Sequence, residues 1–206
     1  MHISEGILSA PVLISSGGLA AAATAVGLKK IDTEHMVHTA ILASSFFVAS
    51  LVHVNIGPVS VHLILNGLVG ILLGLAAFPA ILVALVLQAV LFQYGGLTAL
   101  GINLLIMALP GVMVHYLFSP FLKQDSKWQF WAGLGAGMLS IFLSGVLMAA
   151  ALWFTDEGFW ATCVGVVTAH IPVMIIEGII TGFCISFLAK VYPEILPHTP
   201  EPLFHG

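Results

Sequence analysis

The fold depends on residues 60–93, which read SVHLILNGLVGILLGLAAFPAILVALVLQAVLFQ and contain no Asp, Glu, Lys or Arg. A transmembrane helix needs about 20 mostly apolar residues, so this stretch could hold two short spans or one bent element. Pro79 favours a break, because the residue before a proline is disfavoured in the helical conformation. We therefore expect two spans, 60–77 and 79–93, and keep the single bent element as the alternative.

The rest of the chain has the same apolar character. Of its 206 residues, 60% are hydrophobic and only 7% are charged, whereas soluble domains carry roughly 25% charged residues. Most of the surface must therefore face lipid, and we expect an all-α, polytopic membrane protein. Residues 1–190 should form a single transmembrane helical domain, and 191–206 a short cytoplasmic tail. The segments expected to span the membrane are 8–28, 36–54, 60–77, 79–93, 98–118, 128–153 and 159–189.

The positions of the lysines favour seven spans. The basic residues are Lys29, Lys30, Lys123, Lys127 and Lys190. Seven spans put all of them on one side of the membrane, whereas joining 60–77 and 79–93 would separate the first two from the rest. Because short cytoplasmic loops are enriched in lysine, the seven-span count places the C-terminus in the cytoplasm and the N-terminus outside. The expected location is the cell (inner) membrane.

Several functional classes lack their sequence signals. The net charge of −4 gives no electrostatic footprint for nucleic acid. The chain contains no GxxxxGK[ST] sequence, so it cannot use a P-loop to hydrolyse ATP. It also lacks the HExxH sequence of zinc peptidases. The remaining partners are lipid, other membrane proteins and a cation.

The first two residues, Met1 and His2, can chelate a metal ion. The α-amine, the amide nitrogen of His2 and an imidazole nitrogen of His2 can close a five-membered and a six-membered ring on one ion. We expect Met1 to be retained, because methionine aminopeptidase requires a small second residue and because no basic stretch of a cleaved signal precedes the first apolar run. Tetragonal nitrogen sites suit Ni(II) or Cu(II), and three coplanar donors leave one position open.

His62 is the candidate for the open position. The lysine argument puts it on the same outer side as Met1, and His53 and Asn55 lie at similar depth. Ionisable groups inside a membrane are costly and are functional candidates for that reason. The alternative for each histidine is an interfacial residue that is only hydrogen-bonded.

Two further stretches carry polar residues. In LFQYGGLTALGINLL (91–105), Gly95 and Gly96 indicate a tight outer turn, and Gln93, Tyr94 and Asn103 either face the site or only pack. In AHIPVMIIEG (169–178), His170 and Glu177 share one helix face. They are either a polar element that couples the helices or a simple hydrogen bond between helices.

Four stretches together resemble one family of membrane proteins. They are MHISEGILSAPVL, HVNIGPVSVHLILNGLVGILLG, LFQYGGLTALGINLLIMALPG and HIPVMIIEGIITGF. In this order they resemble the substrate-binding membrane component, of the CbiM/NikM type, of energy-coupling factor cobalt/nickel importers. The resemblance implies that the N-terminus enters the helix bundle, where Met1, His2 and His62 hold the metal in a near-planar set of nitrogens.

The resemblance also implies partners and shows two departures. The expected partners are a transmembrane coupling protein, two cytoplasmic ATPase subunits and, in some systems, a small accessory membrane subunit. Tyr94 stands where relatives often carry aspartate or histidine, and Ile106 where many have a second asparagine. Either change would alter the surroundings of the metal.

The expected function is capture of Ni²⁺ or Co²⁺ outside the cell and its delivery inward, powered by the separate ATPases. The sequence does not choose between the two metals, which are cargo, and no resident cofactor or enzymatic activity is expected. Two alternatives remain open. One is an intramembrane metalloenzyme with a metal-activated water, and the other is a structural membrane subunit whose histidines are interfacial.

Overall fold

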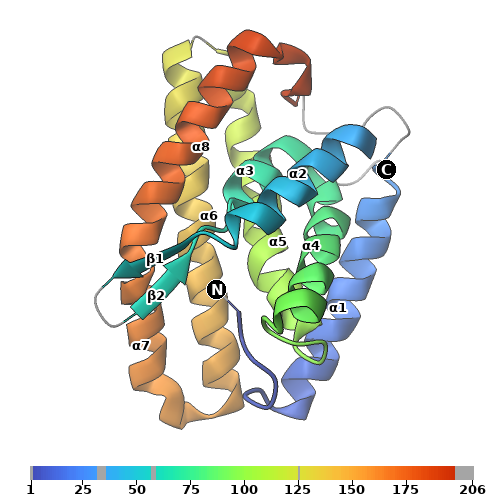
Figure 1. Ribbon diagram of the computed structural model, residues 1–206, viewed down its shortest axis with the longest axis vertical. Coiled ribbons are helices and arrows are strands. Elements are labelled where there is room, and N and C mark those ends of the chain that lie inside the picture. Colours follow the sequence, from blue (N-terminus) through green and yellow to red (C-terminus); the bar gives the residue numbers. More distant parts are fainter. Residues whose placement is uncertain (1, 32–35, 57–58, 125, 198–206) are drawn as a thin grey trace.

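The computed structural model describes residues 2–31, 36–56, 59–124 and 126–197 as a bundle of helices with one short hairpin (Figure 1). The helices are α1 (Ala10–Leu28), α2 (Met36–Ala49), α3 (Asn66–Leu73), α4 (Ala77–Phe92), α5 (Leu100–Phe118), α6 (Ser126–Thr155), α7 (Trp160–Ala169) and α8 (Ile171–Val191). The strands are β1 (His53–Ile56) and β2 (Val59–His62), and a short 3₁₀ turn, η1 (Gly74–Ala76), joins α3 to α4.

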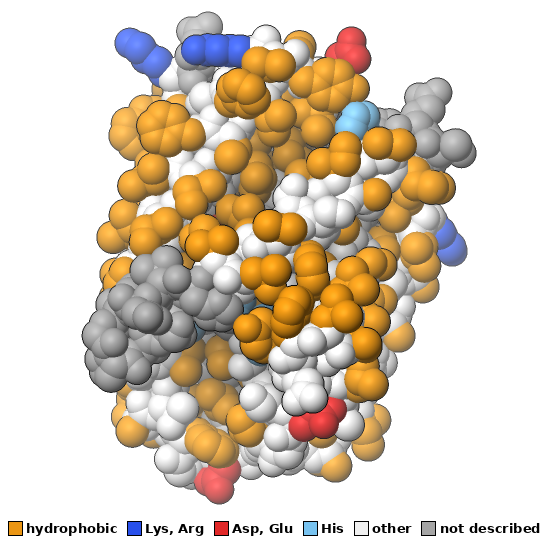
Figure 2. All heavy atoms as spheres, in the orientation of Figure 1, with side chains coloured by type: hydrophobic (Ala, Val, Ile, Leu, Met, Phe, Trp, Pro, Cys, Tyr) orange, Lys and Arg blue, Asp and Glu red, His pale blue; other side chains and the backbone are white. Residues whose placement is uncertain are grey.

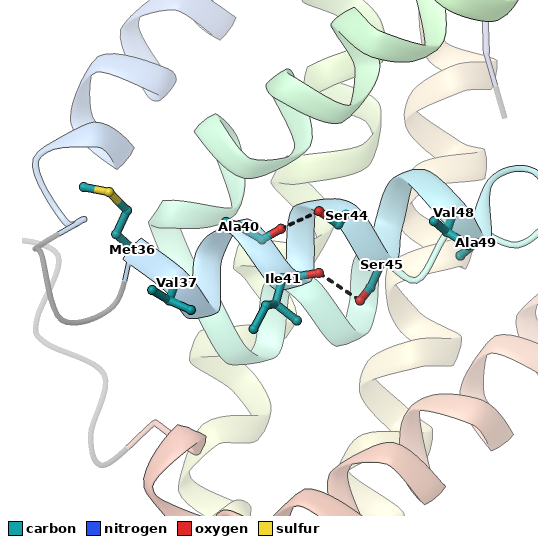
Figure 3. A pocket seen from close by; sticks show the side chains of 8 residues that line it. All are labelled: Met36, Val37, Ala40, Ile41, Ser44, Ser45, Val48 and Ala49. Carbon is teal, nitrogen blue, oxygen red and sulfur yellow. Dashed lines mark hydrogen bonds between the residues drawn. The ribbon is translucent and has the colours of Figure 1, made fainter.

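The described helices fit a multi-pass membrane protein. Five segments are long and apolar enough to cross a membrane, and α2 is a shorter apolar helix. Figure 2 shows hydrophobic side chains over most of the visible face, while the lysines visible on it lie in its upper half. Two serines are exposed on α2. Ser44 and Ser45 donate to the carbonyl oxygens of Ala40 and Ile41 in their own helix, so their hydroxyl groups have partners without water (Figure 3).

The hairpin corrects two of the expected helices. The segments 36–54 and 60–77 were expected to be continuous helices, but α2 ends at Ala49 and β1 pairs with β2 in antiparallel register, His53 opposite His62. The fold is therefore helical, as expected, with one two-stranded hairpin that was not expected. A short apolar run rich in valine and isoleucine cannot be told from a helix by periodicity alone, and these residues also favour strands.

The chain reverses direction at η1. Along α3, Asn66, Gly70 and Gly74 lie beside Met107, Gly111 and His115 of α5, so the two helices run in parallel. In contrast, α4 starts beside the last turn of α1, where Gly27 contacts Leu75 and Pro79, and it ends beside the N-terminal segment. The break expected at Pro79 thus lies earlier, at Gly74–Ala76, and Pro79 is inside the first turn of α4.

This arrangement gathers the lysines at one end of the bundle. The ends of α5 and α8, near Lys123 and Lys190, lie against the beginning of α6 with Lys127, and the end of α1, near Lys29, contacts the turn between α3 and α4. At the opposite end, Glu5 bonds to the loop before α5, and Ser9 N donates to Thr155 Oγ1 at 3.4 Å. Assignment of the lysine end to the cytoplasm stays a prediction.

Glycine contacts set the separation of the central helices. Residues 66–72 of α3 are all buried. A methyl group added to Gly70 would overlap the backbone of Gly111 in α5, and one added to Gly67 would lie 2.5 Å from Ser140 Oγ in α6. In a membrane, where apolar helices gain little by leaving lipid, such close backbone packing drives their association.

The packing at Gly70 predicts a large effect from one methyl group. Gly70→Ala should lower the free energy of unfolding by about 1–3 kcal/mol, because overpacking forces α3 away from α5. The control is Gly145→Ala in α6, where an added Cβ has no neighbour within 4 Å. Helix propensity should then leave stability unchanged or raise it by up to about 1 kcal/mol. Thermal melts in detergent measure both, and equal melting temperatures for the two variants would contradict the packing argument.

Candidate metal centre

The N-terminal segment is held inside the bundle by the side chain of Asn103. Ile3 N donates to Asn103 Oδ1 at 2.9 Å, and Asn103 Nδ2 donates to Ile3 O at 3.0 Å. Both residues are almost fully buried. The amide of Asn103 therefore satisfies both backbone polar groups of Ile3. The segment can be buried in an apolar interior because these groups are not left without partners.

The glycine pair after α4 allows the segment to approach. Gly95 and Gly96 have φ angles of 74° and 93°, in the left-handed region that favours glycine. A side chain at Gly95 would meet Asn103 Nδ2 at 2.6 Å and His2 Cδ2 at 3.4 Å, and one at Gly96 would overlap Glu5. His2 thus packs against the tight turn that the sequence indicated at Gly95 and Gly96.

His2 and His62 lie together although 60 positions separate them in the chain. Their ring centroids are 5.0 Å apart, and the ring of Tyr94 lies 5.9 Å from that of His2. His62 is the last residue of β2, and the turn that follows it leads into α3. The hairpin therefore brings the later histidine to the buried N-terminal segment.

A chain of hydrogen bonds sets the tautomer of His2. Ser50 Oγ donates to Phe47 O at 2.6 Å, so it accepts from Gln88 Nε2 at 2.8 Å. The oxygen Oε1 of Gln88 then faces His2 Nε2 at 2.7 Å, and because an amide oxygen only accepts, Nε2 must donate. In the neutral ring the lone pair is therefore on Nδ1, the nitrogen that closes a six-membered chelate ring with the amide nitrogen of His2.

His62 has the opposite tautomer. Its Nδ1 lies 2.9 Å from Leu63 O, and because a carbonyl oxygen only accepts, Nδ1 carries the proton. The lone pair of the neutral ring is then on Nε2. The two neighbouring imidazoles thus have complementary tautomers, each fixed by the hydrogen bond that its other nitrogen makes.

The remaining candidates from the sequence differ in their positions. Met1 lies outside the described residues, and so do the side chains of His53 and Asn55, whose backbones belong to β1. Gln93 is exposed at the C-terminal end of α4, with a φ of 59°.

Sequence reasoning missed Gln88. It is fully buried and contacts His2 directly. Its signal was visible, because it is the single amide in the apolar run ILVALVLQAVLF, residues 81–92. A polar residue in such a run needs a buried partner, and here the partner is the imidazole of His2.

A family comparison identifies the kind of protein to which this site belongs. Residues 2–195 match the model of a family, CbiM, described as "Cobalt uptake substrate-specific transmembrane region". The chain belongs to the CbiM family. It is accordingly a multi-pass protein of a transport family rather than an enzyme.

Relatives and a solved structure agree with this membership. A "Putative metal transport protein" of Haemophilus influenzae is 42% identical over 202 residues, covering 97% of this chain and 98% of the relative. The "Putative fused nickel transport protein NikMN" of Archaeoglobus fulgidus is 27% identical, covering 98% of this chain and 70% of the relative. A crystal structure of a transition metal transporter superposes with a TM-score of 0.79 at 27% identity, covering 93% of each chain.

The contact between Glu5 and Thr98 predicts a pH effect on the N-terminal segment. Thr98 N donates to Glu5 Oε1 at 3.0 Å, and this bond lowers the pKa of the exposed Glu5 carboxyl. Because the pKa is lower when the segment is docked, the bond contributes above the ordinary glutamate pKa near 4.3 and is lost as the pH falls through the docked value. Hydrogen exchange in residues 2–8, corrected for intrinsic pH dependence, should therefore accelerate in acid.

The matched variant is Glu5→Gln, which cannot titrate. Its exchange at neutral pH should be faster than that of the natural chain, and the extra acceleration in acid should disappear. An identical pH profile in both proteins would mean that another group controls the docking of this segment.

Proposed function

We propose that this protein captures Ni²⁺ or Co²⁺ from the outer side of the cell membrane and passes it inward as part of an energy-coupling factor importer. The donors are the α-amine of Met1, the amide nitrogen and Nδ1 of His2, and Nε2 of His62. The observation that carries the proposal is the pair of imidazoles 5.0 Å apart, with tautomers that leave lone pairs on those two nitrogens.

The chemistry of the donors suits these metals. The backbone amide of His2 must lose its proton to bind, and the resulting nitrogen is a strong in-plane donor that favours tetragonal coordination. With the amine and Nδ1 it forms two fused chelate rings, and His62 completes a plane of four nitrogens. Binding therefore releases protons and weakens in acid.

The proposed orientation puts the lysine end in the cytoplasm, in accordance with the positive-inside rule. Metal then enters from the side on which Glu5 and Asp156 lie. The chain has no P-loop sequence, so two cytoplasmic ATPase subunits and a transmembrane coupling protein supply the energy. The relative from Archaeoglobus fulgidus is named as a fused protein, NikMN, which supports a further partner for this chain, and we propose a small accessory membrane subunit in that role.

The two alternative functions are less well supported. A metalloenzyme needs a coordination position for reactive water, and four planar nitrogens leave none in the plane. A purely structural subunit has no need for Gln88 and Leu63 to give two adjacent histidines complementary tautomers.

Two changes to the donors test the proposal. Adding one residue before Met1 displaces the α-amine, and His62→Ala removes the fourth nitrogen. Each should weaken Ni²⁺ binding by at least about 100-fold in competition titrations with the purified protein. Loss of an atom that binds the metal directly should cost more affinity than loss of a residue that only supports a ligand, which typically costs about 10–100-fold. The intact mass should show an unblocked Met1, and Co²⁺ titrations run in parallel measure selectivity.

The control is His38→Ala, which removes an imidazole from α2, where its ring centroid lies 5.5 Å from that of Tyr192 at an interplanar angle of 45°. This variant should bind Ni²⁺ as the natural protein does. Unchanged affinity in both donor variants would overturn the proposed site, and equal losses in all three variants would point to general instability.

The hydrogen bond from His2 to Gln88 gives a second prediction. Gln88→Leu keeps much of the volume but removes the acceptor that fixes the tautomer of His2, so Ni²⁺ affinity should fall about 10–100-fold. Gln93→Leu, at the exposed end of the same helix, should leave the affinity unchanged. Equal affinities for the two variants would show that Gln88 does not tune the site.

A further inference from the structure

Glu177 is a buried acidic side chain that the proposed donor set does not use. It lies in α8 and is fully inaccessible, and it is the only acidic residue buried among the described ones. Placing a carboxylate among apolar helices is costly, so such a group is retained for a specific task. His170, which the sequence placed on the same helix face, bonds instead to Val166 O of its own turn, at 2.6 Å.

The carboxylate of Glu177 binds the backbone that follows His62. Leu65 N donates to Glu177 Oε1 at 3.0 Å and to Oε2 at 2.9 Å, and Ile64 N donates to Oε1. These amides precede α3, and Leu65, its N-cap residue, makes no side-chain capping bond and has a φ of 55°. Glu177 thus accepts, from another helix, the amides of the N-cap residue and of the residue before it.

One peptide group connects Glu177 to the imidazole of His62. The carbonyl oxygen of Leu63 accepts from His62 Nδ1, and the amide N–H of Ile64 in the same peptide group donates to Glu177. A peptide is planar, so fixing its N–H also fixes the direction of its carbonyl oxygen. The carboxylate therefore acts on the ring through a rigid, polarisable unit.

This arrangement resembles a known way of tuning metal ligands. A histidine ligand usually donates its second N–H to a carboxylate or carbonyl, which fixes the ring and makes the coordinating nitrogen more basic. Here the carbonyl of Leu63 accepts from His62, and the carboxylate of Glu177 accepts from the N–H of the same peptide group. A negative charge on Glu177 polarises the peptide between Leu63 and Ile64, so the carbonyl accepts more strongly and Nε2 of His62 becomes a better donor.

We propose that Glu177 is the positioning residue of the metal site, holding and polarising His62 through the peptide group between Leu63 and Ile64. This inference rests on the proposed function, because it takes His62 as a ligand. It assigns to α8 a direct part in metal affinity, although no residue of α8 belongs to the donor set.

The test is a double-mutant cycle measured by Ni²⁺ competition titration. Glu177→Leu should weaken binding about 10–100-fold. Glu177→Gln should have an intermediate effect, because its amide oxygen still accepts but carries no charge. In the His62→Ala background, the same substitutions should have no further effect on the residual affinity, since Glu177 acts only through His62.

Spectroscopy separates positioning from general stability. The ligand-field absorption of the Ni²⁺ complex should shift in Glu177→Gln toward that of His62→Ala, which a purely structural change would not produce. The control is Thr181→Ala, one turn further along α8 and equally buried, which should leave affinity and spectrum unchanged. If Glu177→Leu does not fold, the double-mutant cycle is measured with Glu177→Gln alone.

The outcomes distinguish the two proposals. If His62→Ala itself binds Ni²⁺ like the natural protein, the proposed function fails. If His62→Ala loses affinity but the Glu177 variants bind normally, or lose the same factor with and without His62, only the role of Glu177 is overturned. An equal loss in Thr181→Ala would likewise overturn it.

Discussion

The structure of the candidate site depends on one constraint, which is that a polar group buried in this apolar bundle is costly unless it finds a partner inside it. At the candidate site, three side chains provide such partners. Asn103 satisfies the backbone of Ile3, Gln88 accepts from His2, and Glu177 accepts from the amides before α3. Each of these bonds also fixes a segment or ring that carries a proposed metal donor. The side chains that satisfy buried polar groups therefore also position the proposed donors.

Close packing of small residues makes these contacts possible. Glycines bring α3 against α5 and α6, and Gly137 of α6 lies against the backbone of α8 at Glu177 and Gly178. Glu177 can therefore reach the beginning of α3, because the helices between which it lies are separated by little more than their backbones. Larger residues at the glycine positions would move the carboxylate away from its partners.

Much of the organisation could be predicted from the sequence because its causes are local. Composition indicated a polytopic membrane protein, and Pro79 indicated a break in the stretch 60–93, which the structure places earlier, at Gly74–Ala76. The chelating potential of Met1 and His2 follows from adjacent residues alone. The hairpin was missed, because its valines and isoleucine fit a helix and a strand equally well.

The sequence by itself determined the membrane class and the positions of the lysines, and it suggested the nitrogen donors that we propose, since these follow from composition and from neighbours in the chain. Only the tertiary structure decided that His2 and His62 meet and which tautomer each adopts. It also decided that Gln88 and Glu177 serve them, from α4 and α8 respectively. These contacts join residues 60 to more than 100 positions apart, and the partner of a buried polar group is chosen by helix packing, which no local pattern encodes.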